Sequence, residues 1–421
     1  MGQPGLTPPP GAQELPLSLS QREVWLDYLA WPDSPHLNIG GRMYLVGRLD
    51  VDRFKQAMKW LIEENDALRL VPRPDGRQWR LAQYEGMLEE VDFSGEPDPE
   101  ASMQAWQAAR MRVPFKLGEV PPWRFALLKA RDDLHLLINQ FHHTLMDGWG
   151  TARVVQRWNE IYQDLEAGRT PAPPERPDYL AFIQESLDYR NSPAFERDAD
   201  YWRSHVGALP EPLFEPRYAG TPRNALPDAR VVRHPIKRAD YNALEKVAQT
   251  GATTIYHWFL AALAIYLTRI SRRTSVLIGV PSLNRGGKRF KATLGMFVGV
   301  LPLRIEIDPE MTVADAITSV TALLRNAYRH PRFPVSELGR ELEVIKHGRA
   351  GLFDVLLSYE RQDYTCHFGE ARGIEPRQTF SGKARYPLGL TVCEFQADQD
   401  VDLIVEGSAG FFSADEVAAF G

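Results

Sequence analysis

The sequence predicts an α/β protein built from two lobes. In each half of the chain, an apolar run of strand length leads through a turn into a segment whose apolar residues recur at helical spacing. The clearest such pair is residues 133–140 followed by 151–168. A proline-rich stretch at residues 169–177 separates the halves and has the composition of an extended, semi-rigid linker. We therefore expect an N-terminal lobe over residues 17–170 and a C-terminal lobe over residues 171–421.

Composition excludes several classes of protein. The chain has 421 residues, 44% of them hydrophobic, which is enough for two or three domains. A net charge of −6 indicates no general affinity for nucleic acid or anionic membrane. No apolar run approaches the roughly 18–20 residues that a membrane span needs. The two cysteines, Cys366 and Cys393, cannot form a disulfide framework, so we expect a cytoplasmic protein in which both are packed thiols.

The first lobe begins after a disordered segment. Residues 1–16 are rich in Gly and Pro, lack the apolar core of a secretory signal and are expected to be disordered. Ser18 or Ser20 is expected to cap a first helix. A strand over 43–47 and an amphipathic helix over 51–65 follow.

The strand at 133–140 runs into the stretch Phe141-His142-His143-Thr144-Leu145-Met146-Asp147-Gly148-Trp149-Gly150. Adjacent strand residues point to opposite faces, so only one of the two histidines can enter a given cavity. Binding of one metal ion by both is therefore disfavoured, and no nearby Cys or Glu completes a zinc set. A histidine here suits proton transfer, because its ordinary pKa lies near physiological pH.

The residues of this stretch do not by themselves decide the roles of the histidines, of Asp147 and of Gly148. One histidine would act as general base or proton positioner and the other would pack. Asp147 could orient the imidazole or hold the loop through a distant cation. Gly148 would allow a backbone conformation closed to residues with a Cβ. Taken alone, a His-His pair after a strand is more often incidental than catalytic.

The second lobe repeats the α/β pattern. Residues 241–247 and 255–270 are expected to be helical, and the second of these is nearly all apolar and so buried. Strands are expected at 276–280, 353–359 and 388–395, the last two paired in the core. Residues 410–416 lead into a final helix, and the chain stops soon after, as expected of a domain trimmed near its last helix.

The stretch His142-His143-x-x-x-Asp147-Gly148 resembles the signature of the condensation domains of nonribosomal peptide synthetases, within the chloramphenicol-acetyltransferase-like superfamily. Further likenesses are the Ser18-x-x-Gln21 opening and residues 294–304. The chain departs from the family pattern at several residues, among them Leu37, which precedes Asn38 where the family usually has a Tyr-Asn pair. Asn65-Asp66 replaces the usual His-Glu, and Gly299 lies near a position where the family often has Asn.

The resemblance implies a fold and a reaction. The fold is two chloramphenicol-acetyltransferase-like α/β sandwich lobes in a V shape, with a central tunnel that two phosphopantetheine arms enter from opposite faces. The reaction is attack of a carrier-bound aminoacyl amine on an acyl thioester, which gives an amide and a free thiol.

The resemblance also implies roles for single residues. His143 would be the base or positioner in the tunnel, and His142 would be structural. Asp147 would form a salt bridge with Arg285 across the site, on the second lobe, and Gly148 could donate its N–H to the oxyanion. Trp149 and Gly299 would line the tunnel, although for Trp149 plain core packing is the better account.

Implied partners are peptidyl carrier protein domains, neighbouring synthetase domains, and a donor that is either acyl-CoA or an acyl-loaded carrier. No metal and no tightly bound cofactor is implied. The short segment before the first motif suggests a starter domain that acylates the first amino acid from acyl-CoA. The alternatives are an elongation domain with a carrier-bound donor, a stand-alone CoA-dependent acyltransferase, and an inactive module that recruits carriers. The sequence does not specify the acyl donor, the acceptor amino acid or the oligomeric state.

Overall fold

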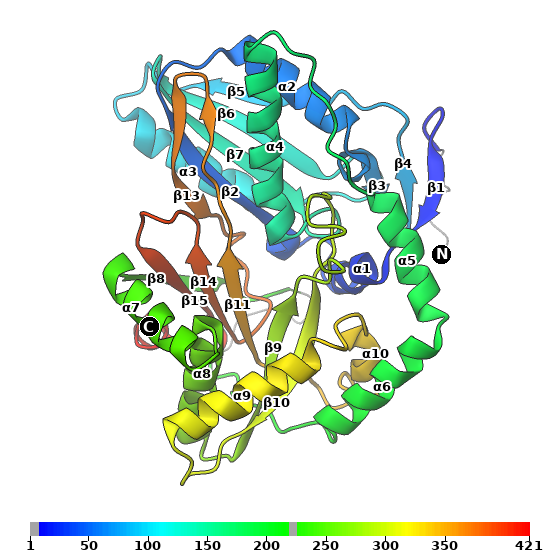
Figure 1. Ribbon diagram of the computed structural model, residues 1–421, viewed down its shortest axis with the longest axis vertical. Coiled ribbons are helices and arrows are strands. Elements are labelled where there is room, and N and C mark those ends of the chain that lie inside the picture. The colour runs from blue at the N-terminus through cyan, green and yellow to red at the C-terminus, as the bar shows by residue number, and fades with distance from the viewer. Residues whose placement is uncertain (1–7, 219–224) are drawn as a thin grey trace. The chain divides into compact units, whose positions relative to one another are not determined.

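The computed structural model describes residues 8–218 and 225–421 (Figure 1). Contacts between residues group the chain into two units. Unit 1 comprises Met1–Asp188, Arg285–Phe297 and Gln362–Gly382, and unit 2 comprises Tyr189–Asn284, Val298–Arg361 and Lys383–Gly421. The grouping does not follow chain order, because two short segments from the second half belong by their contacts to unit 1. The boundary drawn at residue 170 stays a prediction.

Unit 1 is organised around a sheet of six strands in the order β12-β13-β2-β7-β6-β5. The β5–β6 pair is parallel and the other pairs are antiparallel. The last two strands in sequence come from the segment Gln362–Gly382, so β13 completes the sheet beside β2 from more than 300 residues away. The strands are β2 (Asn38–Val46), β5 (Leu88–Asp92), β6 (Trp123–Arg131), β7 (Leu134–His142), β12 (His367–Phe368) and β13 (Ala371–Gln378).

Helices cover both faces of this sheet. On one face, α4 packs beside α2, and the Trp158 indole N–H donates to the Phe54 carbonyl at 3.0 Å while its ring lies against Phe125. On the other face, α3 places Met103 against a buried cluster that contains Ala126, the next residue along β6. The helices are α1 (Leu19–Ala30), α2 (Val51–Glu63), α3 (Pro99–Met111), α4 (Gly148–Glu166) and α5 (Tyr179–Arg190), with short 3₁₀ turns η1 (Pro35–Leu37) and η2 (Asp66–Arg69).

The first described residues correct one expectation. Residues 13–16, placed by the sequence in a disordered segment, form β1 (Gln13–Pro16) in a three-stranded sheet with β4 (Arg77–Arg80) and β3 (Leu70–Pro72). The Gln78 side chain donates to the Pro16 carbonyl at 2.8 Å, so the strand gains a tertiary partner that local composition does not reveal. The same expectation for residues 1–7 lies outside the described residues.

Ser18, rather than Ser20, is the cap of α1. The Gln21 N–H donates to the Ser18 hydroxyl at 3.1 Å, and the Ser18 N–H donates to the Gln21 side-chain oxygen at 3.0 Å, which is a reciprocal capping box.

Unit 2 contains a second sheet of six strands, in the order β10-β9-β11-β14-β15-β8. The two expected core strands are β11 and β14, and they pair in parallel. The strands are β8 (Ala229–Ile236), β9 (Ser275–Ser282), β10 (Gly299–Glu306), β11 (Val355–Arg361), β14 (Leu388–Glu394) and β15 (Val401–Ser408). The helices assigned wholly to this unit are α6 (Pro193–Val206), α7 (Arg238–Thr250), α8 (Ile255–Ser271), α9 (Val313–Ala327), α10 (Val335–Glu341) and α11 (Ala414–Ala418).

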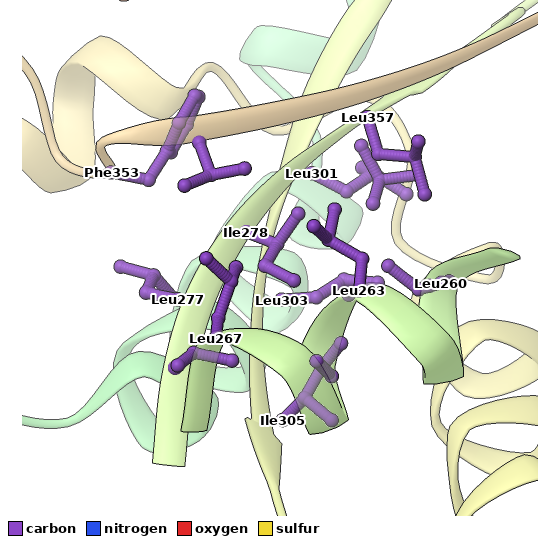
Figure 2. Packing of buried hydrophobic residues seen from close by; sticks show 14 of the residues in the cluster. Leu260, Leu263, Leu267, Leu277, Ile278, Leu301, Leu303, Ile305, Phe353 and Leu357 are labelled. Carbon is purple, nitrogen blue, oxygen red and sulfur yellow. The ribbon is translucent and has the colours of Figure 1, made fainter. Parts of the chain in front are cut away.

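A large core of unit 2 lies between α8 and the strands of this sheet. Figure 2 shows Leu260, Leu263 and Leu267 of α8 meeting side chains of β9 and β10. This accounts for the nearly all-apolar character of residues 255–270. The predicted α/β class is confirmed. Among the described residues, no helix combines the length and the apolar character that crossing a bilayer requires.

Candidate active site

The His-His stretch lies where β7 gives way to α4. Backbone bonds continue past the end of the strand, because the His142 N–H donates to the Pro122 carbonyl and the His143 N–H to the Leu37 carbonyl, each at 2.8 Å. Asp147 then caps α4, accepting the Gly150 N–H at 2.8 Å. The helix begins at Gly148, three residues before the expected start, because this cap satisfies its first turn.

His142 is a buried packing residue. Its Nδ1 accepts the Thr144 N–H at 3.2 Å, lies 2.8 Å from the Thr144 hydroxyl, and therefore carries no proton. The rings of Tyr28 and Phe115 meet it edge-on. Burial, with smaller contributions from His143 and His36, lowers the pKa of His142 to about 3, so the imidazole is neutral at physiological pH.

His143 is only partly covered and has one ring nitrogen committed. Its Nδ1 lies 2.9 Å from the Met146 carbonyl, an acceptor, so Nδ1 carries the proton and the lone pair resides on Nε2. Burial lowers the pKa of His143, and the nearby charge of Asp147 opposes this shift. The imidazole is thus neutral near pH 7 and presents a basic nitrogen. The sequence left open whether Asp147 orients the imidazole or holds the loop through a distant cation. In the structure, the group that bonds the His143 ring is the Met146 carbonyl and not the Asp147 carboxylate.

Asp147 is paired with Arg285, as expected. An Arg285 guanidinium nitrogen donates to Asp147 Oδ1 at 2.6 Å, and the side chains are 2% and 0% exposed respectively. Asp147 Oδ2 accepts the Phe297 N–H at 3.0 Å. The second Arg285 nitrogen donates to the Thr293 carbonyl at 2.7 Å, and its charge lies 4.0 Å from the centre of the Phe297 ring. Burial lowers the pKa of Arg285, while Asp147 acts in the opposite direction.

The placement of Arg285 on the second lobe needs correction. By its contacts, Arg285–Phe297 belongs to the same unit as Asp147. The segment folds back on itself around the guanidinium, which bonds carbonyls within the segment as well as the carboxylate.

Gly148, the first of the two glycines in the turn, behaves differently from expectation. Gly148 does not adopt a positive φ and simply begins α4. The constrained position is Gly150, where a Cβ would come within 2.3 Å of the Met146 sulfur. A side chain at Gly150, two residues after the predicted position, would thus force the Met146 side chain to move.

The two predicted tunnel residues lie in different units. Trp149 is partly exposed, and its indole N–H donates to the Lys291 carbonyl at 2.9 Å, so plain core packing does not describe it. Gly299 is the first residue of β10 in unit 2, opposite Ser282. A tunnel-lining role for either residue stays a prediction.

Gln21 is a site residue that the sequence reasoning did not select. Its side-chain N–H donates to the Thr144 carbonyl at 3.0 Å, inside the His-His stretch, while its oxygen completes the Ser18 capping box. The Ser18-x-x-Gln21 motif was the available signal, but the spacing alone does not show what the amide reaches.

The model of one protein family, described as "Condensation domain", matches residues 11–414, nearly the whole chain. The chain belongs to the condensation domain family. Condensation domains catalyse amide-bond formation, an acyltransferase reaction, and carry no tightly bound cofactor.

Curated relatives of this condensation domain are nonribosomal peptide synthetases. It is 27% identical over 372 residues to a dimodular nonribosomal peptide synthase of Bacillus subtilis (strain 168), covering 86% of this chain and 15% of the relative. It is 27% identical over 390 residues to bacitracin synthase 3 of Bacillus licheniformis, covering 90% of this chain and 6% of the relative. The chain thus spans only a small part of the length of these relatives.

Solved structures agree with the fold. The starter condensation domain of rhizomide synthetase RzmA has a TM-score of 0.79 at 25% identity, covering 97% of this condensation domain and 93% of that chain. The first condensation domain of the calcium-dependent antibiotic synthetase, at 24% identity, has a TM-score of 0.83 and covers 97% and 94%. The predicted chloramphenicol-acetyltransferase-like fold is confirmed.

In the described part of the condensation domain, no group of three or more His, Cys, Asp or Glu side chains is arranged to hold a metal ion. Both cysteines are buried thiols.

Proposed function

We propose that this condensation domain joins a carrier-bound aminoacyl group to an acyl group delivered as a CoA thioester, as a starter domain of a nonribosomal peptide synthetase. Family membership supports amide formation. The starter subtype is supported by likeness to the RzmA starter domain, one structure of which is described in complex with C8-CoA and Leu-SNAC. The observation that carries the chemistry is His143, a neutral imidazole with its Nδ1 proton held by Met146 and Nε2 basic.

In this proposal, the reaction needs little more than positioning and proton transfer. The acceptor amine attacks the thioester carbon, the C–N bond forms and the C–S bond breaks. His143 Nε2 accepts or positions the amine proton, which finally resides on the departing thiol. Holding both thioester arms in line replaces a bimolecular encounter and can contribute several kcal/mol, up to about 7–11.

The Gly148 N–H is the proposed donor to the oxyanion that forms at the thioester carbon. It lies at the N-terminus of α4, where first-turn N–H groups have no intrahelical partner and the helix dipole favours negative charge. Asp147 and Arg285 are proposed to hold this turn in place, and Trp149 and Gly299 to line the tunnel.

The proposed partners are peptidyl carrier domains and neighbouring synthetase domains, and the proposed location is the cytoplasm, where both thiols stay reduced. An elongation role with a carrier-bound donor is the second candidate. It is favoured by the dimodular synthase among the relatives, of which this chain matches only 15%.

The test is intact-mass analysis of an aminoacyl-loaded carrier protein incubated with the condensation domain and a panel of acyl-CoAs. We expect a mass gain equal to the acyl group, abolished by His143→Ala and retained by His347→Ala, a control at an exposed histidine of unit 2. A gain only with acyl-loaded carriers would establish the elongation role instead. No gain with any donor would contradict both and favour a module that recruits carriers.

A further inference from the structure

Residues 362–369, here called the strap, run along α4 before the chain enters β13. The Gln156 side chain donates to the Asp363 carbonyl, and the His367 N–H donates to Asn159 Oδ1 at 2.8 Å. Further along, a Cβ at Gly369 would lie 3.2 Å from the Tyr162 hydroxyl, so the strap also approaches the later turns of the helix closely. Both the strap and α4 belong to unit 1.

Tyr364 connects the strap to the start of α4. Its hydroxyl lies 3.1 Å from the Thr151 hydroxyl, and Thr151 donates its proton to the Gly148 carbonyl at 2.6 Å. Because Thr151 has a single hydroxyl proton and gives it to Gly148, Tyr364 is the donor to Thr151. The phenol has only one proton, and Gln362 Oε1 accepts from it at 2.9 Å, so Thr151 and Gln362 share that proton in a three-centre hydrogen bond. Tyr364 and Thr151 are 7% and 5% exposed, so water does not readily replace this contact.

This chain of hydrogen bonds ends on Gly148, a residue with large backbone freedom. A glycine has no side chain to limit its dihedral angles. On the N-terminal side of Gly148, Asp147 is held by Arg285 and by the Phe297 N–H. On its C-terminal side, Thr151 holds the Gly148 carbonyl. Tyr364 therefore completes a restraint on both sides of Gly148.

We propose that Tyr364 is a positioning residue for amide formation: through Thr151, it holds the Gly148 peptide in the orientation that the developing oxyanion requires. The inference rests on the proposed function, in which the Gly148 N–H stabilises that charge. Such donors must be held to within about 0.5 Å and 10–20° to be effective. Tyr364 touches neither substrate nor reacting atoms in this scheme.

Four variants test the proposal. Tyr364→Phe removes only the hydroxyl and keeps the packing of the ring. Thr151→Val removes the hydroxyl at nearly constant volume, and Thr151→Ser retains it. Asn159→Ala is the matched control, because it removes another hydrogen bond between the strap and α4, two turns further along the helix.

Two readouts are measured on the full chain. The first is the single-turnover rate of amide formation at saturating loaded carrier, with the apparent KM. The second is the exchange rate of the amide hydrogens of residues 148–151, which needs no substrate. Thermal unfolding midpoints show whether each variant is folded.

Removing an oxyanion donor outright lowers the rate by about 10²–10³. A donor that is only held less firmly should cost less, so we expect Tyr364→Phe to lower the rate by about 5- to 20-fold. Its KM should change by less than about two-fold. Thr151→Val should lower the rate at least as much, Thr151→Ser should stay within about two-fold of the parent rate, and the Tyr364→Phe/Thr151→Val double variant should match Thr151→Val alone. Exchange at residues 148–151 should rise about ten-fold in Tyr364→Phe and stay unchanged in Asn159→Ala.

A parent-like rate in Tyr364→Phe, additive losses in the double variant, or an equal loss in Asn159→Ala would each overturn the proposal. If the parent protein forms no amide with any donor, the proposed function fails on its own. The exchange experiment then still decides whether Tyr364 restrains Gly148.

Discussion

Asp147 shows how one residue serves two structural purposes within the signature stretch. Its Oδ1 caps α4 at Gly150 and accepts from Arg285, while Oδ2 accepts the Phe297 N–H. A carboxylate out of contact with water is tolerated because a cation and two backbone donors surround it. These contacts fit a residue that holds the turn, which is the role proposed for Asp147.

Asp147→Ala should destabilise the protein by about 3–5 kcal/mol, because it leaves the Arg285 charge buried without its partner. The double variant Asp147→Leu/Arg285→Met leaves no unpaired charge. Its free energy of unfolding should therefore fall by less than that of Asp147→Ala. Urea unfolding followed by tryptophan fluorescence measures both.

Asp164→Ala is the control for this pair. Asp164 bonds Arg169 at 2.7 Å, but that guanidinium side chain is 62% exposed. A surface pair contributes only about 0–1 kcal/mol, so this variant should unfold near the parent concentration of urea. If Asp147→Ala and Asp164→Ala lowered the free energy of unfolding equally, the stabilising role of the buried Asp147–Arg285 pair would be contradicted.

At the scale of elements, the segment Arg285–Phe297 depends on glycine to pass close to α5. Gly295 has a φ of +145°, and a Cβ there would come within 2.2 Å of a Tyr179 ring carbon. The ring cannot move aside easily, because Tyr179 donates its hydroxyl to the Met296 carbonyl at 2.6 Å and is itself buried. The Asp147–Phe297 bond lies at the end of this segment.

Gly295→Ala should therefore cost about 2–4 kcal/mol, since overpacking adds to backbone strain. Gly287→Ala is the matched control, because Gly287 also has a positive φ, +68°, but nothing lies within 4 Å of its Cβ position. Strain alone there should cost about 1–2 kcal/mol. Differential scanning calorimetry separates the two, and equal shifts in Tm would rule out the steric contact with Tyr179.

At the scale of the whole molecule, the two units are interleaved in sequence. Unit 1 takes β13 and Arg285 from the second half of the chain, so residues 1–188 alone lack one neighbour of β2 and the partner of Asp147. An uncovered strand edge and an unpaired buried carboxylate both oppose folding.

A fragment of residues 1–188 should consequently fail to give a rigid fold, in contrast to the full chain. Soluble yield and near-ultraviolet circular dichroism provide the measurement. A fragment with sharp aromatic circular dichroism and cooperative unfolding would show that the two inserted segments are dispensable for unit 1.

Local pattern determined much of this protein from the sequence by itself. Strand-length apolar runs and helical spacing predicted the α/β class. An element that is buried on one face carries apolar residues at regular intervals along the sequence. Alternation along a strand separated the two histidines, and the His142-His143-x-x-x-Asp147-Gly148 spacing pointed to the family. These features are encoded within a few consecutive residues.

Tertiary structure decided what those residues contact. The ordering of residues 13–16, the membership of Arg285 in unit 1 and the Tyr364–Thr151–Gly148 chain all join groups whose partners no local pattern reveals. Tyr364 and Thr151 are 213 residues apart in the chain. A hydrogen bond of this kind depends on where two stretches of backbone that are distant in sequence pass each other within unit 1, which is set only when that unit has folded.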